Sequence, residues 1–403
     1  MKRFLCIMCV VCLGLMLFPQ AMEAKTQNIP ITSKYFPDEY FRMFVDRYDL
    51  DRNEILDADE ISGVEYMNLS YSNFKDSGKI KSVEGINYFK KSLKHLTISN
   101  TSITQLTISS FSELTRLDIT NNRSLTKCTV SSNKKMTNLS CYYNSIKSLS
   151  LSSNSALTYL DCSDNILTSL TVNAKIKTID CSGNQLTKLD MSSKQDLIAL
   201  NCSSNKLTSL KVNTGIVELI CCDNNIPALT LTNRTSLARL SCGNNSLSKL
   251  DVTTNTVLEA LSCEGNKLTA LDLSRNKLLK RLSCGYNPLN GIDVKENKEL
   301  TDFSCDGIGL TVLEVRENKK LQHLSCSQNK LTELDLSENK DLAVLWCGYN
   351  LFTELDMSSN PKLWKLWCGY NDIAVLNVAD NADLWELLCE ENDLWELDVS
   401  NNK

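Results

Sequence analysis

Cysteine is the residue whose number and spacing in this chain could do chemistry. Eighteen of the 403 residues are cysteines. Most of them recur every 21 residues, with two intervals shortened to 19. The recurring residues are Cys141, Cys162, Cys181, Cys202, Cys221, Cys242, Cys263, Cys284, Cys305, Cys326, Cys347, Cys368 and Cys389.

A regular row of thiols could form disulfides, bind metal, carry out redox chemistry or fill a core as small apolar side chains. One cysteine per 21 residues lacks the paired C-x-x-C spacing of a metal cluster. On neighbouring parallel strands the Cβ atoms would lie about 4.8 Å apart, whereas a disulfide prefers about 3.8 Å. We therefore expect a buried, reduced row. Cys222, next to Cys221, should point outward as the most reactive thiol.

A second candidate site is the acidic segment 49–60, which reads D-L-D-R-N-E-I-L-D-A-D-E. It looks like the calcium loop of an EF-hand, in which side-chain oxygens and one backbone carbonyl hold the ion. Glu54 stands where that pattern has glycine, at a cost of about 1 kcal/mol or more of backbone strain. The alternative is a degenerate cap whose acids are only solvated, and either version would cover the first repeat. The expected calcium ligands are Asp49, Asp51, Asn53, Ile55, Asp57 and Glu60.

The elements that position these residues are repeats of the form L-x-x-L-x-C-x-x-N-x-L-x-x-L-D-L-x-x-N-x-x, about fifteen of them between Leu93 and the end of the chain. Because L-x-C alternates, Leu and Cys point to one side of a short strand and their neighbours to the other. Successive units then form a parallel sheet, and each buries its apolar side against the next. The L-D-L step predicts a second short strand on the opposite wall, with its aspartates serving solubility.

An asparagine follows each recurring cysteine by three residues, except in the Cys305 unit, where Ile308 takes its place. The amide can bond to backbone groups that the turn leaves unpaired. We therefore expect a local defect at Ile308. The two short units are altered near 172–176 and 212–216, so we expect both deletions in the return turn rather than in the strand.

These repeats resemble those of the bacterial internalins, specifically the subclass with 21-residue units and an inward row of cysteines. Repeat length, Cys, Asn and the L-D-L step carry the resemblance over about 93–403. It implies a leucine-rich-repeat solenoid with a curved parallel β-sheet on its concave side, short extended segments on its convex side and a small helical N-terminal cap. It also implies a secreted or surface protein that binds a partner on a host or neighbouring cell.

The five tryptophans all lie late in the chain, from Trp346 to Trp395. Two of them stand between the strand Leu and Cys, where five consecutive earlier units have serine, and should project from the concave face. Exposed aromatic clusters mark binding sites, although they could instead stabilise the last repeats by about 0.2 to 1 kcal/mol per cross-strand pair. Nearby Glu386, Glu390 and Glu391 favour a cationic partner or a stacking sugar. The predicted binding residues are Trp346, Trp367, Tyr349, Tyr370, Trp364, Trp385 and Tyr286.

The two ends of the chain predict its organisation. Residues 1–24 combine Lys2, Arg3, an apolar run and small residues near Ala24, which is typical of a signal peptide. No later segment reaches the roughly 20 apolar residues of a membrane span. We expect a cap with an EF-hand-like loop and irregular half-repeats over 25–92 and the solenoid over 93–403. Net charge is −5, from 43 basic and 48 acidic residues, and this balance disfavours nucleic-acid binding.

The sequence favours binding over catalysis. An enzyme needs a nucleophile, a base and an orienting group together, and the only histidines are His95 and His323. We expect an exported, non-catalytic protein that recognises a protein or glycan through its concave face, chiefly at the aromatic C-terminal repeats. It should require no cofactor, and calcium at the cap is one of the two alternatives for the acidic loop. One alternative is a structural component of an envelope assembly that makes contact through Leu394, Trp395 and Leu397 in the last repeat. An enzyme is the less favoured alternative.

Overall fold

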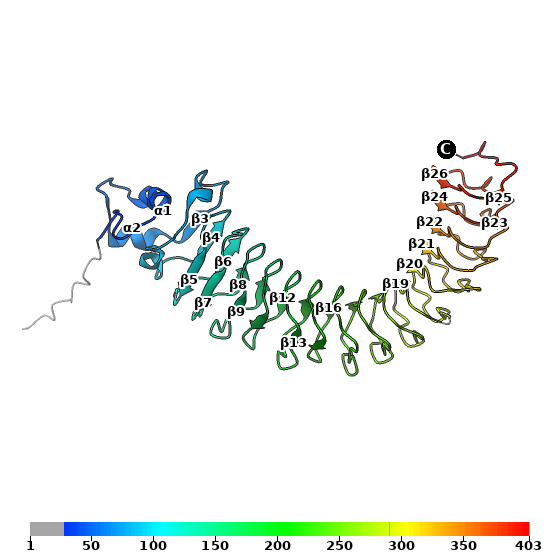
Figure 1. Ribbon diagram of the computed structural model, residues 1–403, viewed down its shortest axis with the longest axis horizontal. Helices are drawn as coiled ribbons and strands as arrows, with labels where there is room; N and C mark the ends of the chain where they lie inside the picture. The colour runs from blue at the N-terminus through cyan, green and yellow to red at the C-terminus, as the bar shows by residue number, and fades with distance from the viewer. Residues whose placement is uncertain (1–27, 290, 403) are drawn as a thin grey trace, which may run out of the picture.

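The computed structural model describes residues 28–289 and 291–402. The expected signal peptide, 1–24, lies outside the described residues. The described chain forms a curved solenoid with a helical cap at its N-terminal end (Figure 1). This is the leucine-rich-repeat architecture that the sequence predicts.

The N-terminal cap is a helix–loop–helix unit held by a small sheet. It contains β1 (Ile29–Pro30), α1 (Glu39–Val45), a 3-10 turn (Asp46–Tyr48), β2 (Ile55–Leu56) and α2 (Ala58–Gly63). Asp38 caps α1 by accepting a hydrogen bond from the Phe41 N–H, and Phe41, Phe44 and Val45 of this helix are buried. Asp57 and Glu60 form a capping box at α2. Further 3-10 turns at Ser77–Lys79 and Ile86–Phe89 connect the cap to the repeats.

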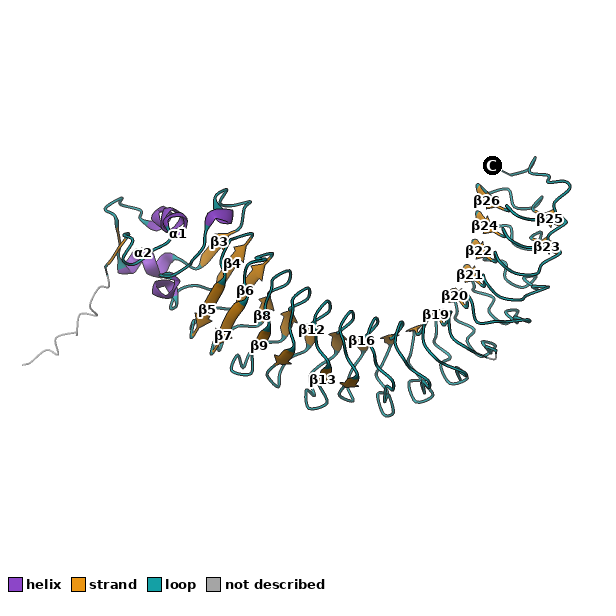
Figure 2. Ribbon diagram, viewed as in Figure 1, coloured by secondary structure: helices purple, strands orange, loops and turns teal. Residues whose placement is uncertain are grey.

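The concave wall is one parallel sheet of sixteen strands, whose order follows the chain (Figures 1 and 2). We call each of its strands, with the turn that follows, a rung. The sheet begins inside the segment assigned to the cap, because β3 pairs with β4. Its strands are β3 (Tyr66–Leu69), β4 (His95–Ser99), β6 (Arg116–Thr120), β8 (Asn138–Ser140), β10 (Tyr159–Asp161), β12 (Thr178–Asp180), β14 (Ala199–Asn201), β16 (Glu218–Ile220), β17 (Arg239–Ser241), β18 (Ala260–Ser262), β19 (Arg281–Ser283), β20 (Asp302–Ser304), β21 (His323–Ser325), β22 (Val344–Trp346), β24 (Lys365–Trp367) and β26 (Glu386–Leu388).

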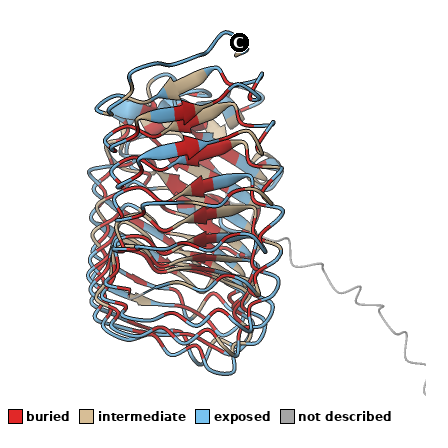
Figure 3. Ribbon diagram, turned by 90° about the vertical axis from the view of Figure 1, so that its right-hand side faces the viewer, coloured by how far each residue is buried: buried red, intermediate tan, exposed pale blue. Residues whose placement is uncertain are grey.

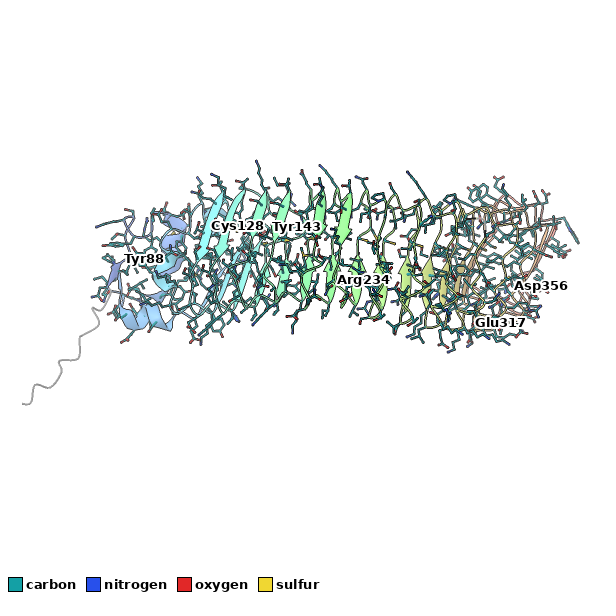
Figure 4. The ribbon with its side chains drawn as sticks, turned by 90° about the horizontal axis from the view of Figure 1, so that it is seen from below. Tyr88, Cys128, Tyr143, Arg234, Glu317 and Asp356 are labelled. Carbon is teal, nitrogen blue, oxygen red and sulfur yellow. The ribbon has the colours of Figure 1, made fainter. Side chains whose placement is uncertain are left out.

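The convex wall is extended but only partly strand. Figure 4 views this side, where the labelled Cys128, Glu317 and Asp356 lie. Where the L-D-L step and its equivalents pair, they form four two-stranded parallel sheets. These are β5 (Gln105–Ser109) with β7 (Lys127–Ser131), β9 (Ser148–Ser150) with β11 (Ser169–Thr171), β13 (Lys188–Asp190) with β15 (Ser209–Lys211), and β23 (Glu354–Asp356) with β25 (Val375–Asn377).

The recurring cysteines lie in the core between the two walls. From Cys141 to Cys368 each is at most 1% exposed, and all cysteines of the described residues are free thiols. Figure 3 shows the buried strand centres stacked along the solenoid. Burial raises the pKa of the Cys284 and Cys368 thiols to about 12. The prediction of a buried row is therefore confirmed for these residues, whereas Cys389, on the last described rung, is only partly buried.

Two rows of buried asparagines hold successive rungs in register. In the row that the sequence predicts, Asn266 donates 3.0 Å hydrogen bonds to the Cys242 and Cys263 carbonyls and accepts one, also 3.0 Å, from the Leu247 N–H. A second row lies at the other turn, where Asn318 donates to the Val294 and Asn297 carbonyls at 3.0 and 2.9 Å. Each asparagine thus joins two repeats through backbone groups that the turns leave unpaired.

The expected defect at Ile308 is present. In the neighbouring rungs the Leu268 and Leu310 N–H groups donate to the asparagines Asn287 and Asn329, both at 3.0 Å. Ile308 cannot accept such a bond, and the equivalent N–H of buried Leu289 has no partner among the described residues. The two short units behave as predicted, because their missing residues lie between β11 and β12 and between β15 and β16, outside the strands.

Candidate functional site

The concave face carries a hollow of about 620 Å³ between β16 and β24. We call it the trough. Its lining includes the outward-facing first and third residues of seven successive strands, β16 to β22, together with Trp364 and Lys365. The central residue of each strand is buried beneath them. The strands that line it run along the inner side of the arc in Figure 1. A groove built this way follows the solenoid axis and crosses the strands.

Five small side chains line the trough on successive strands. Ser241, Ser262, Ser283, Ser304 and Ser325 are the third residues of β17 to β21. Ser262 donates a 2.7 Å hydrogen bond to Glu264, and Ser304 and Ser325 donate to Asp306 at 3.0 and 2.7 Å. A hydroxyl that has donated its proton still offers lone pairs. These three serines therefore present acceptor oxygens to any ligand in the trough.

Tryptophans close the C-terminal end of the trough. Trp346 is 43% exposed and, with the half-buried Trp364, lines the hollow. The Trp364 ring stacks on the exposed Trp385, with centroids 6.0 Å apart and planes 12° from parallel. The Lys365 ammonium lies 5.9 Å from the centre of the Trp346 ring and 2.8 Å from Glu386. We call Trp346, Trp364 and Trp385 the aromatic end.

The other predicted aromatic residues lie at the edge of the trough. Tyr349 and Tyr370 stack at 4.2 Å with nearly parallel rings, and Trp367 meets Tyr349 edge-on at 6.0 Å. Trp367 also donates a 3.1 Å hydrogen bond to Glu390. A Cβ atom on Gly348 would stand 3.0 Å from its indole, so this glycine makes room for the ring. We call Trp367, Tyr349 and Tyr370 the tyrosine rim.

Tyr286 stands apart from this rim. Its ring lies over Gly307, three rungs before Tyr349. The structure therefore divides the predicted patch into the aromatic end, the tyrosine rim and one isolated tyrosine.

The backbone at the three tyrosines follows the turn of the repeat. Tyr286, Tyr349 and Tyr370 have φ angles of 54°, 56° and 58°, in the left-handed region. Earlier rungs have the same conformation at this position with residues of several types, including Tyr143, Asp164, Gly183 and Asn244. The positive φ is therefore a property of the repeat turn and does not by itself assign a function to these tyrosines.

The acidic loop brings together three of its six predicted calcium ligands. Oxygen atoms of Asp49, Asp51 and Glu60 lie within 4.8 Å of one another. Asp57 instead accepts hydrogen bonds from the N–H groups at the start of α2, and Asn53 Oδ1 accepts one from the Ile55 N–H. Glu54, in the place of the expected glycine, has a φ of 62°, as the EF-hand pattern predicts.

The electrostatics of the loop show crowding of negative charge. Desolvation and repulsion from Asp49 and Glu60 raise the pKa of Asp51. Burial also acts to raise the pKa of Asp49, but hydrogen bonds from the Glu54 and Asn53 N–H groups outweigh it and lower that pKa. The two neighbouring carboxyls thus have pKa values shifted in opposite directions, that of Asp49 down and that of Asp51 up. The oxygen-only donor set fits a hard cation such as Ca²⁺.

The remaining reactive residues of the described chain are its two histidines and Cys222. His323 Nδ1 lies 2.7 Å from an oxygen of Asp302, which is an orienting contact for a base. Among the described residues, no serine, threonine, cysteine or lysine side chain forms a hydrogen bond with this histidine. His95 packs against Tyr66 on the first rungs. Cys222 is partly exposed as expected, and its sulfur lies 2.9 Å from Ser241 Oγ.

Comparison with known proteins agrees with this repeat architecture. No family model matches the chain, and no curated protein matches it. Among solved structures, the functional domain of InlJ from Listeria monocytogenes, described as including a cysteine ladder, is 30% identical with a TM-score of 0.76, over 89% of this chain and 79% of that one.

Two further structures share the fold. A leucine-rich-repeat protein of Leptospira interrogans has a TM-score of 0.69 at 20% identity, over 85% of this chain and 89% of that one. The internalin InlF of Listeria monocytogenes has a TM-score of 0.60 at 18% identity, over 90% and 97%.

The fold and its repeats define a leucine-rich-repeat solenoid. The similarity to InlJ goes further, and the chain belongs to the internalins, in the group with a cysteine ladder. Over the part of the chain that the structure describes, no helix is long and apolar enough to cross a membrane.

Proposed function

We propose that this chain is an exported bacterial binding protein that holds a protein or glycan partner in the concave trough, without catalysing a reaction. The observation that carries the proposal is the trough itself, which ends at Trp364 and the exposed Trp346. Large aromatic side chains near the centre of an interface supply most of its binding energy. The family membership supports a secreted or surface location.

Arrays of glycans and of extracellular protein domains, probed with the purified chain, test this function. Trp346→Ala should weaken binding to any partner found by at least about tenfold, because a hot-spot residue contributes roughly 2 kcal/mol or more. Trp395→Ala is the matched control, since Trp395 is 76% exposed and does not line the trough. Equal loss from both variants, or from neither, would overturn the trough as the binding site.

The acidic loop supports a second proposal, that the cap binds Ca²⁺. Asp49, Asp51 and Glu60 would hold the ion, whose charge would relieve their mutual repulsion and fix the loop between α1 and α2. Isothermal titration should show uptake at or below about 1 mM, the range of extracellular calcium modules. The melting temperature should rise as ligand binding stabilises the folded state.

The control for calcium is a matched pair of variants. Glu60→Gln should abolish uptake, whereas Asp59→Asn, which makes the same charge change outside the ligand set, should preserve it. If the wild-type chain takes up no calcium at about 1 mM, the loop is only a cap.

A further inference from the structure

The last three described rungs carry a regular row of side chains at the turn beside the trough. On successive rungs the same turn position holds Tyr349, Tyr370 and Glu391, with φ angles of 56°, 58° and 52°. The Tyr370 N–H donates to the Glu390 carbonyl at 2.9 Å, and Tyr349 makes the equivalent bond one rung earlier, so the turns are in register. Because the two tyrosine rings are stacked 4.2 Å apart, the stack runs along the solenoid axis.

The tyrosine stack ends at a carboxylate. Glu391 takes the place that a third ring would have, about 4.8 Å further along the axis. Among the described residues, Tyr349 is the only ring that contacts the Tyr370 ring, and no cation lies over it. Tyr370 is 41% exposed. One face of this ring is therefore open to a partner.

Two carboxylates lie beside this open ring, those of Glu391 and Glu390. A hydrogen bond with Tyr349 raises the pKa of Tyr370, and repulsion from both carboxylates adds to the rise. The Trp367 indole donates a 3.1 Å hydrogen bond to one oxygen of Glu390, which positions this side chain and leaves its second oxygen free. Neither carboxylate has an ion-pair partner among the described residues.

The acidic side chains of this region are not matched by cations. Residues 366–402 contain nine acidic side chains, and all 43 basic residues of the chain lie outside this segment. Lys365, on the preceding strand, already pairs with Glu386 at 2.8 Å. Lys330 has no ion pair in the described chain, but it lies three rungs before Glu391. That separation is roughly 14 Å, which exceeds the Debye length of about 8 Å at physiological ionic strength.

A guanidinium group fits this position in both shape and charge. It is planar, stacks on aromatic rings and pairs with carboxylates through its N–H groups, whereas an ammonium is a compact and strongly hydrated point charge. A guanidinium on the open face of Tyr370 would continue the ring stack by one place. Its N–H groups would then meet Glu391 and the free oxygen of Glu390 in charge-assisted hydrogen bonds.

The early rungs have a similar turn with a cation of the chain's own. Tyr143 occupies the turn position of Tyr370 there, and Asp164 follows on the next rung in the place of Glu391. Arg123 and Tyr143 line the same hollow of about 330 Å³. The late rungs repeat the tyrosine and the carboxylate, but the described residues supply no arginine beside them. A partner would have to provide it.

We propose that the tyrosine rim binds an arginine side chain of a partner protein, whose guanidinium stacks on Tyr370 and pairs with Glu391 and Glu390. Because the rim lies at the edge of the trough, this arginine would anchor one border of the bound partner. The inference rests on the proposed function and selects a basic protein segment, rather than a glycan, as its partner.

The experiment is fluorescence anisotropy with three dye-labelled peptides of equal length, which alternate glycine with arginine, lysine or glutamine. We expect the arginine peptide to bind about fivefold more tightly than the lysine peptide, because only the guanidinium stacks as a plane. The glutamine peptide should not bind. Tyr370→Ala should remove the advantage of arginine over lysine, and Glu391→Gln should weaken both charged peptides about threefold.

Two matched variants serve as controls. Tyr143→Ala removes the tyrosine at the same turn position of an early rung, and Glu333→Gln makes the same charge change at an exposed position of the convex wall. Neither should alter binding of the arginine peptide. Melting temperatures show whether a loss reflects folding, and the exposed Glu391 provides a second test if Tyr370→Ala is unstable.

Equal binding of the arginine and lysine peptides, binding of the glutamine peptide, or equal losses from Tyr370→Ala and Tyr143→Ala would contradict the inference. So would unchanged binding in Glu391→Gln. If the arginine peptide does not bind while Trp346→Ala weakens an array partner, the arginine contact is wrong but trough binding stands. If the arginine peptide binds through Tyr370 while no array partner depends on Trp346, the trough fails as the binding site and the rim stands alone.

Discussion

The first and last rungs of the concave sheet share one scaffold but treat their outward surface differently. Polar side chains bond to one another on both. On the early rungs Asp118 pairs with Arg116 at 2.8 Å, and on the late rungs Arg239 pairs with Glu218 at 2.9 Å. The late rungs add small serines, an arginine without an ion pair, Arg281, and exposed tryptophans. The inward residues therefore specify the fold, whereas the outward residues decide which rungs have unused binding capacity.

The strongest test of the shared scaffold removes one asparagine from each half. Asn184 on an early rung and Asn266 on a late rung make the same contacts with the cysteine carbonyls and a leucine N–H. Substitution by alanine leaves at least two buried backbone groups unpaired, at about 1–3 kcal/mol each. Both variants should lose about 3 kcal/mol of unfolding free energy in urea titrations.

The outward-facing Asn201→Ala is the control and should lose less than about 1 kcal/mol. A much smaller loss at Asn266 than at Asn184 would show that the late rungs do not use the same scaffold.

Two tryptophans of the late rungs, Trp367 and Trp346, are expected to have different roles. Trp367 packs over Gly348, contacts Tyr349 and bonds to Glu390, whereas Trp346 is more exposed. We expect Trp367→Ala to cost about 2 kcal/mol in stability, through lost packing and a lost hydrogen bond. Trp346→Ala should change stability by less than about 0.5 kcal/mol and act on binding. The melting temperatures of both variants, together with their binding to the array partner, distinguish a role in stability from a role in binding.

The opposite pattern would favour the other interpretation of the aromatic residues. If Trp346→Ala lowers the melting temperature strongly while binding is unchanged, the tryptophans serve to stabilise the last rungs.

Sequence periodicity was sufficient to predict the solenoid, the buried cysteines and the defect at Ile308, because all three follow from inward residues that repeat. Arg281 repeats in no such pattern, and its lack of a partner depends on which side chains lie within reach on adjacent rungs. The separation of Trp367 from the aromatic end likewise depends on Gly348, which leaves room for the Trp367 indole. This contact can be recognised only when the positions of both residues are known. The second asparagine row was visible in the repeat motif, but its function required the backbone carbonyls to be placed.

Ile308 offers a smaller test of the scaffold. Ile308→Asn should restore an acceptor for the Leu289 N–H. It should also give a second donor to the Cys284 and Cys305 carbonyls, which already accept hydrogen bonds from Asn287 and Asn329. We expect a gain of about 1 kcal/mol, measured by urea unfolding. Asn287→Ile, the reverse change one rung earlier, should lose more than this. A loss of stability in Ile308→Asn would mean that burial of the isoleucine outweighs the restored hydrogen bonds.

The smallest effect expected concerns the aspartates of the L-D-L step on the convex wall. Asp190 accepts hydrogen bonds from the Ser192 hydroxyl and N–H at 2.6 and 3.0 Å, and Asp251 accepts the same bonds from Thr253. These bonds, from the side chain first, lower the pKa of both carboxyls below the ordinary value of 3.8. Because the folded-state pKa is the lower one, the stabilisation is present above the unfolded value and is lost as the pH falls through the folded one.

Melting temperatures should therefore fall as the pH is lowered below about 4, on early and late rungs alike, since both halves carry these aspartates. The double variant Asp190→Asn and Asp251→Asn should show a shallower fall than the wild-type chain. Glu333→Gln is the control, because Glu333 is an exposed acid with no hydrogen-bond partner in the described chain. If the melting temperatures of the double variant and the control depend on pH in the same way, the aspartates of these turns do not contribute to the acid sensitivity of the fold.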